Sequence, residues 1–132
     1  RAQLERLPDI VAARRRVRDW YVSELDGIAA ADVTGDPPWG VSNDWLTTVR
    51  FDSAQTPGGS TRVRLALEAE NIESRPIWKP MHQQPVFADH EAHLNGVADQ
   101  LFADGLCLPS GFTLEQSDIK RICQTIIATL KP

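Results

Sequence analysis

The sequence predicts a small α+β fold in which helices cover one face of a short sheet. Four segments repeat their apolar residues at the 3.6-residue period of a helix. Three shorter segments between these helices have the apolar or β-branched composition of strands. Helix and strand therefore alternate along the chain, and about three short antiparallel strands covered by helices form a layered α+β domain.

The composition is that of one globular domain. The chain has 132 residues, of which 42% are hydrophobic and 24% charged, and this is enough apolar material for one core. Its formal net charge of −4 argues against a nucleic-acid-binding domain, which is usually basic. The sequence contains no apolar run of about 18 residues, so no membrane-spanning helix is expected.

The two cysteines are predicted to be buried thiols. Cys107 and Cys123 belong to no Cys-x-x-Cys or His-rich pattern, so neither a metal site nor a redox pair is expected. Free thiols are typical of a reducing compartment, and we expect a cytoplasmic protein. Because the chain begins with Arg1 and enters a helical pattern at once, we expect it to be a piece of a longer protein.

Residues 1–26 form the first predicted helix. Its apolar side chains cover a very broad arc of the helical wheel, which predicts contacts beyond its own domain. Pro8 marks either a kink or the true start of the helix, and Gly27 is the expected C-terminal cap. The apolar residues are Leu4, Leu7, Ile10, Val11, Val17, Trp20, Tyr21, Val22 and Leu25.

Four arginines lie close together in this helix, namely Arg14, Arg15, Arg16 and Arg18. We interpret them as a solvated face whose stems lie over apolar surface, in preference to a phosphate site. If a second domain borders the helix, Arg14 or Arg18 is expected to pair with carboxylates of that domain.

The remaining elements follow from local pattern. They are a loop at 30–44, a strand at 45–51, a helix at 61–71, a strand at 73–77, a helix at 91–104, a strand at 106–108 and a helix at 115–130. Ser60 and Asp89 are predicted to cap the starts of two of these helices, and Gly105 the end of one.

Residues 72–82 are the strongest candidate for a binding site. Two prolines exclude a helix interior and hold the segment extended. Arg75, Lys79 and His82 add three hydrogen-bonding side chains, and an arginine suits bidentate binding of a carboxylate or phosphate. These residues alone leave two interpretations equally open: a site for an anionic ligand, or a surface loop anchored by a buried Trp78.

No other constellation indicates catalysis or metal binding. His90, Glu91 and His93 have a His-Glu-x-His spacing, which we interpret as a solvated first turn of a helix and not as a metal site. The sequence lacks a Gly-x-Ser-x-Gly motif, a phosphate-binding loop and a dinucleotide-binding glycine pattern.

The segment around the two prolines resembles a known family. Residues 71–82, Asn-Ile-Glu-Ser-Arg-Pro-Ile-Trp-Lys-Pro-Met-His, and residues 84–87, Gln-Pro-Val-Phe, are similar to the C-terminal segment of the DegT/DnrJ/StrS sugar-nucleotide aminotransferases. Three further stretches resemble that family in the same order, at residues 1–7, 42–47 and 105–111. The resemblance therefore extends over essentially the whole chain.

The resemblance implies a parent enzyme that moves an amino group from an amino acid, usually glutamate, to a keto sugar on a nucleoside diphosphate. Such enzymes depend on pyridoxal phosphate, which a lysine of a large N-terminal domain holds. None of the three lysines of this chain matches it. Residues 1–132 are thus expected to be the small C-terminal domain of a fold-type-I aminotransferase, inactive alone and without bound cofactor. Residues 1–26 would be its interdomain helix and residues 42–132 its α+β core.

The resemblance also implies roles for single residues and partners. Arg75 is the expected contact for a substrate anion, and Lys79 and His82 are weaker candidates for the nucleotide sugar. Trp45 and Trp78 are expected to serve packing. The expected partners are the large domain, the nucleotide sugar, the amino donor and a second subunit in a homodimer, with no nucleic acid and no membrane.

A second hypothesis rests on the same residues. Three donors without catalytic machinery are also typical of a non-catalytic α+β module that binds an anionic sugar nucleotide or a protein partner. In either case, the uncovered apolar surface of the first helix predicts self-association near Leu4, Leu7, Val11 and Trp20.

Overall fold

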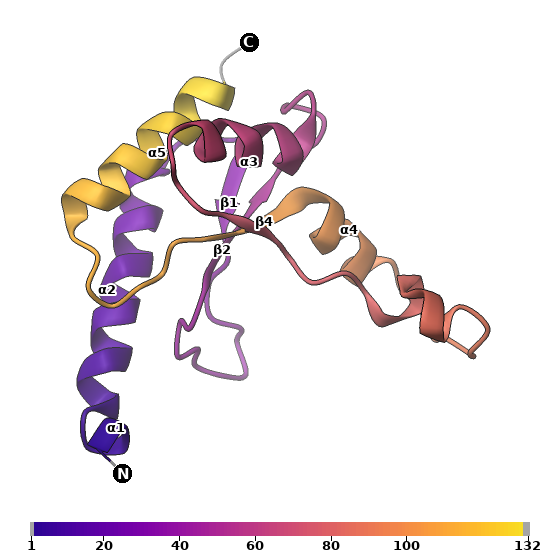
Figure 1. Cartoon of the computed structure of the whole chain (residues 1–132), viewed down its shortest axis with the longest axis horizontal. Coiled ribbons are helices and arrows are strands. Elements are labelled where there is room, and N and C mark those ends of the chain that lie inside the picture. The colour runs from indigo at the N-terminus through magenta and orange to yellow at the C-terminus, as the bar shows by residue number, and fades with distance from the viewer. Residues whose placement is uncertain (1, 131–132) are drawn as a thin grey trace.

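The protein is built on one antiparallel sheet, in a computed structural model that describes residues 2–130 (Figure 1). The strands lie in the order β1 (Ala31–Val33), β2 (Thr47–Phe51), β4 (Gly105–Leu108) and β3 (Arg75–Pro76). Helices α2 (Leu7–Glu24), α3 (Gly59–Ala69) and α5 (Gln116–Leu130) share a core with the sheet, and α5 contacts both α2 and α3. The predicted α+β class is confirmed, with four strands in place of three.

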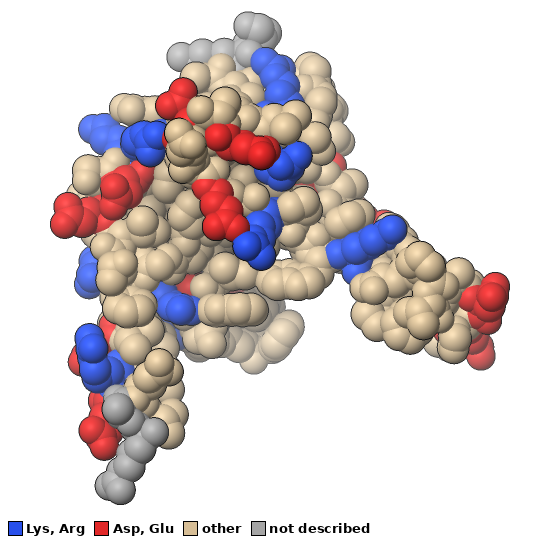
Figure 2. Space-filling view, in the orientation of Figure 1, with Lys and Arg blue, Asp and Glu red and all other residues tan. Residues whose placement is uncertain are grey.

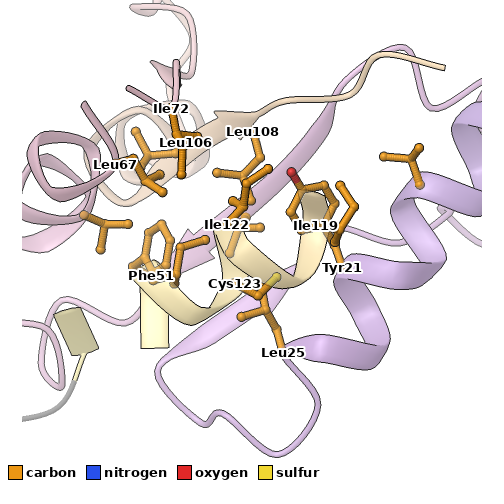
Figure 3. Packing of buried hydrophobic residues seen from close by; sticks show 14 residues of the cluster. Tyr21, Leu25, Phe51, Leu67, Ile72, Leu106, Leu108, Ile119, Ile122 and Cys123 are labelled. Atoms are coloured by element: carbon orange, nitrogen blue, oxygen red, sulfur yellow. The ribbon is translucent and has the colours of Figure 1, made fainter. Parts of the chain in front are cut away.

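The hydrophobic core joins the sheet to these three helices (Figure 3). Alternate residues of β2 point inward, so Val49 and Phe51 are buried while Arg50 between them is exposed. Tyr21 of α2 is fully buried, and its hydroxyl donates a hydrogen bond to the carbonyl oxygen of Pro109 at 3.0 Å. Burying one such large apolar side chain stabilises the fold by about 1.5–3 kcal/mol.

The first predicted helix is two helices. The short α1 (Ala2–Glu5) ends at Glu5, Arg6 is the N-cap of α2, and α2 begins at Leu7 with Pro8 in its first turn. Pro8 therefore marks the start of the long helix, which is one of the two alternatives that the sequence left open. The C-cap is Leu25, and Gly27 lies two residues further on in the turn, with a φ of 73°.

A fourth strand, β1, lies within the segment that was predicted to be a loop. Its three residues pair with β2, with Ala31 opposite Phe51 and Val33 opposite Val49. Three residues of mixed composition are too few to show the alternating pattern of a strand. They form a strand because they pair with β2. The loop prediction for residues 30–44 was wrong at this position.

Helix α4 (Val97–Asp104) is shorter than predicted. It begins after Gly96, whose φ of 79° suits glycine, so Asp89 is not its cap. Ser60 is not a cap either: the cap of α3 is Gly58, and the hydroxyl of Ser60 instead donates to the carbonyl oxygen of Ala103 at 2.8 Å. Gly105 is the C-cap of α4, as predicted. Its backbone lies close to that of Leu101, since a Cβ at Gly105 would be 2.6 Å from the carbonyl oxygen of Leu101.

The segment between β3 and α4 leaves the body of the molecule as an arm, which we define as residues 78–96. Figure 1 shows it, together with α4, extending away from the helices and the sheet. The arm contains two short 3₁₀ helices, η1 (Met81–Gln83) and η2 (Pro85–Phe87). Its proline content explains why it forms no longer helix.

Candidate functional site

A groove of about 450 Å³ lies where three segments of the sheet meet. The antiparallel register brings them together, because Thr47 of β2 pairs with Leu108 and Arg75 of β3 pairs with Cys107. Residues just before β2, residues around β3 and residues just after β4 therefore share one end of the sheet. The groove is lined by Trp45, Leu46, Glu73, Ser74, Arg75, Pro76, Trp78, Cys107, Leu108, Pro109 and Ser110.

Arg75 lines this groove on the edge strand β3. Its Nε and Nη2 both donate to Oε1 of Glu73, at 2.8 Å and 2.6 Å. Both side chains are exposed, so the ion pair contributes about 0–1 kcal/mol to stability. The pair orients the guanidinium and leaves its Nη1 without a hydrogen-bond partner among residues 2–130.

The other two predicted site residues lie on the arm, outside the lining of the groove. Lys79 is exposed, and its carbonyl oxygen accepts from Nε2 of Gln84 at 3.3 Å. His82 is half-buried, with Nε2 at 2.7 Å from Oδ1 of Asp99 in α4. The structure thus places Arg75 in the groove and does not bring Lys79 and His82 into it with Arg75.

Two tryptophans at the groove correct a sequence prediction. Trp45 and Trp78 were expected to serve packing, but they are 58% and 64% exposed. Their ring centroids are 6.0 Å apart with an interplanar angle of 31°, so the two rings contact each other. A buried Trp78 anchor for the loop is therefore wrong. The pair was not foreseeable from sequence, since 33 positions separate its members and only the sheet brings them together.

The loop that carries Trp45 is held by the arginines of α2. Nη1 of Arg14 donates to the carbonyl oxygen of Trp45 at 3.2 Å, and Nη2 of Arg15 donates to that of Ser42 at 2.8 Å. Arg18 reaches Oδ1 of Asp44 at 3.4 Å. The interpretation as a solvated face was therefore wrong for Arg14, Arg15 and Arg18. It holds for Arg16, which is exposed and lies over the ring of Trp20. The carboxylates that Arg18 contacts in this structure are those of Asp19, Asp36 and Asp44.

The floor of the groove contains a buried thiol. Both cysteines are free and buried, as predicted. Burial raises the pKa of Cys107 above its ordinary value, and burial with the nearby Glu24 carboxylate raises the pKa of Cys123 to about 12. A thiol is nucleophilic only as the thiolate, so these groups are protonated and unreactive at neutral pH.

The residues described offer no metal centre. Within residues 2–130 no three His, Cys, Asp or Glu side chains are close enough to hold an ion. His93 Nε2 lies 3.5 Å from Glu91 Oε1, with both side chains exposed, in the arm and not in the helical turn that was predicted for them. Of the helices in this range, none has the length and apolar composition needed to cross a membrane. Figure 2 shows acidic and basic side chains interspersed over the visible face.

The chain is similar to known aminotransferases. EpsN of Bacillus subtilis (strain 168), which carries the name of a pyridoxal phosphate-dependent aminotransferase, is 37% identical over 131 residues, covering 96% of this chain and 33% of EpsN. The GDP-perosamine synthase of Caulobacter vibrioides is 33% identical over 129 residues, covering 92% of this chain and 33% of that protein. The crystal structure of DesI, determined in the presence of its TDP-sugar product, matches with a TM-score of 0.84 and 25% identity, covering 96% of this chain and 33% of that chain.

These matches identify the class of protein: the chain is similar to one part of an aminotransferase. The chain spans about a third of the length of the relatives it matches. It belongs to the DegT/DnrJ/EryC1/StrS aminotransferase family, whose model matches residues 1–127. The resemblance first seen around Arg75 is therefore confirmed at the level of the family.

Proposed function

We propose that this chain is the small domain of a sugar aminotransferase. Residues 1–26 then join it to a large cofactor-binding domain, and residues 42–132 form its α+β core. The observation that carries the proposal is the family match over residues 1–127. The parent protein transfers an amino group from an amino acid, with glutamate as the expected donor, to a keto sugar on a nucleoside diphosphate. It acts as a cytoplasmic homodimer.

The cofactor proposed for the parent is pyridoxal phosphate, which stabilises the carbanion in reactions of this class. The groove of this chain does not fit that cofactor, because no lysine lines it. Lys79 and Lys120 are both exposed and lie elsewhere. We therefore assign the cofactor and its lysine to the large domain, and we expect this chain alone to be inactive.

In the parent, this domain supplies one wall of the substrate cleft. Arg75 is the proposed contact for a substrate anion, because its Nη1 is unpaired among the described residues and its guanidinium is oriented by Glu73. Lys79 adds an exposed positive charge at the base of the arm. His82 is a weaker candidate for a substrate contact, since its Nε2 already contacts Asp99.

The test uses the intact protein that contains this chain. With pyridoxal phosphate, glutamate and a keto sugar linked to a nucleoside diphosphate, we expect formation of 2-oxoglutarate. Arg75→Gln is expected to raise KM for the sugar about tenfold or more, as loss of a charge-assisted contact does. Arg64→Gln is the matched control, because Arg64 also forms an Arg–Glu pair, with Glu68 at 3.0 Å, but lies outside the groove.

The alternative is a non-catalytic module that binds an anionic sugar nucleotide or a protein partner. Its supporting observation is the unpaired Nη1 of Arg75 in a groove that contains no reactive group. Absence of 2-oxoglutarate with every keto sugar, together with calorimetric binding of a nucleotide sugar to this chain, supports the module and contradicts the enzyme.

A further inference from the structure

The outer edge of the sheet at β1 is a surface whose backbone faces away from the rest of the sheet. Strand β1 has β2 as its only neighbour in the sheet of residues 2–130. The amide of Thr34 donates to the carbonyl oxygen of Thr48 at 3.0 Å, and bonded positions alternate with non-bonded ones along such a pair. The backbone groups of Ala31 and Val33 therefore face away from β2.

Three backbone groups of this edge are left for a further strand. The amide of Ala31 donates to the carbonyl oxygen of Ile28 at 3.0 Å. The carbonyl oxygen of Ala31 and both backbone groups of Val33 have no hydrogen-bond partner within the described part of the chain. Such a row is the template on which an extended peptide adds as a new strand. In this mode of recognition main-chain bonds supply affinity, and the side chains beside the edge supply specificity.

A groove of about 390 Å³ lies beside this edge, between β1 and the end of α2 with the turn that follows it. Its apolar lining includes Val22, which is 47% exposed, together with Leu25 and Ile28. The charged residues that line it are Asp26 and Asp32, and no cation does so. The groove therefore offers apolar surface and negative charge next to the open strand edge.

The two faces of β1 determine which side chains a partner strand needs. Ala31 and Val33 pack against the core, and Asp32 between them is exposed on the opposite face. Directly opposite residues of paired strands contact each other, so apolar side chains fit opposite Ala31 and Val33 and a cation fits opposite Asp32. Arg50 lies 3.8 Å from Asp32 with both side chains exposed, so this weak pair leaves the carboxylate accessible to a second cation.

We propose that the β1 edge binds an extended segment of another protein, which adds to the sheet as an antiparallel strand and carries a basic residue between two apolar ones. Charge complementarity favours this partner over a second copy of the chain, because each copy brings the same carboxylates of Asp26 and Asp32 to the contact. The surface is separate from the groove that holds Arg75, since no residue lines both.

The test measures the fluorescence anisotropy of a labelled peptide, Thr-Val-Lys-Val-Thr, while this chain is added. We expect saturable binding, and the peptide Thr-Val-Glu-Val-Thr should bind about fivefold more weakly. N-methylation of both valines removes the two amides that face β1 and should weaken binding at least about tenfold. N-methylation of the lysine is the matched control, because its amide faces away from β1, and it should leave the affinity unchanged.

Variants of the chain test the charge. Asp32→Lys should reverse the order of the lysine and glutamate peptides, and Asp9→Lys, at an exposed carboxylate outside the groove, should not. Circular dichroism checks that each variant keeps its fold. The proposal is overturned if no peptide binds saturably, if both N-methylations have the same effect, or if Asp32→Lys leaves the order unchanged. Dimers of the chain that the lysine peptide dissociates would assign the edge to a second copy and also overturn it.

Discussion

Asp44 is a buried carboxylate in the loop that carries Trp45. It is 4% exposed and has a φ of 49°, a conformation that aspartate and asparagine tolerate better than most residues. Its Oδ1 accepts from Nη1 of Arg18 at 3.4 Å, and its Oδ2 lies 3.9 Å from Nε of Arg15. A buried carboxylate is stable only when cations and donors surround it. Asp44 thus ties the loop of Trp45 to helix α2.

The first prediction concerns this tie. Asp44→Asn keeps a residue that tolerates the positive φ but removes the charge, so the free energy of unfolding should fall by about 1.5–3 kcal/mol. Asp19→Asn is the control, because Asp19 contacts the same Arg18 at 3.4 Å with a side chain that is 66% exposed. Its effect should stay below about 1 kcal/mol. Urea denaturation measures both changes, and equal losses would show that burial of Asp44 is not the cause.

At the residue scale, the sequence located the groove only in part. The sequence singled out Arg75 from its chemistry, because an arginine beside a proline on an extended segment suits an anion contact, and the structure places it at the groove. Its role as that contact stays a prediction. The partners of Arg15 and Arg18 were not predictable, since Ser42 and Asp44 lie 27 and 26 positions away in the sequence. The cysteines were predicted correctly as buried, because free cysteine packs as a small apolar residue.

At the element scale, two side chains of the arm contact Asp99 of α4. Oδ1 of Asp99 accepts from Nε2 of Gln83 and lies 2.7 Å from Nε2 of His82. Both hydrogen bonds lower the pKa of Asp99 from its ordinary value of 3.8, and the one from Gln83 has the larger effect. The ionised carboxylate is therefore the form that holds the arm.

The second prediction follows from this contact. Asp99→Asn should speed amide hydrogen exchange in residues 78–96. Asp104→Asn should not, because Asp104 lies on the same helix but its carboxylate has no partner among the described residues. The lowered pKa fixes the direction with pH: the contact is present above pH 3.8 and is lost as the pH falls through the lowered value. Exchange in the arm that is the same in both variants would contradict a role for Asp99.

The sequence predicted some helices and strands more accurately than others. The helix at α5 was predicted to within one residue, because Ile119, Ile122 and Ile126 mark its buried face at the spacing of a helix. The predicted start of α4 was wrong. Leu94 fits the apolar pattern of the helix, but it lies exposed on the arm before the helix begins. Strand β1 exists only through its pairing with β2, and three residues carry too little pattern to predict it.

At the scale of the whole molecule, the N-terminal part of the chain presents an uncovered apolar surface. A cavity of about 510 Å³ lies against α1 and the first turns of α2 and includes Leu4, Leu7, Val11 and Phe112. Leu4 is 71% exposed, and no element of residues 2–130 covers it. Trp20 does not belong to this surface, because it packs against the core with the guanidinium of Arg16 5.6 Å from its ring. The sequence prediction of a broad apolar helix face holds for Leu4 and Leu7 and not for Trp20.

The third prediction is that this surface makes the isolated chain self-associate. Exposed apolar patches of this kind lower their free energy by burial against a second copy, at roughly 25 cal/mol per Å². Sedimentation velocity should show a concentration-dependent increase in sedimentation coefficient, and Leu4→Gln with Leu7→Gln should abolish it. Val22→Gln is the matched control, because Val22 is exposed on α2 away from this cavity, and it should leave association unchanged. A monomeric profile at high concentration, or equal behaviour of the two variants, would contradict the assignment of this face as the contact surface.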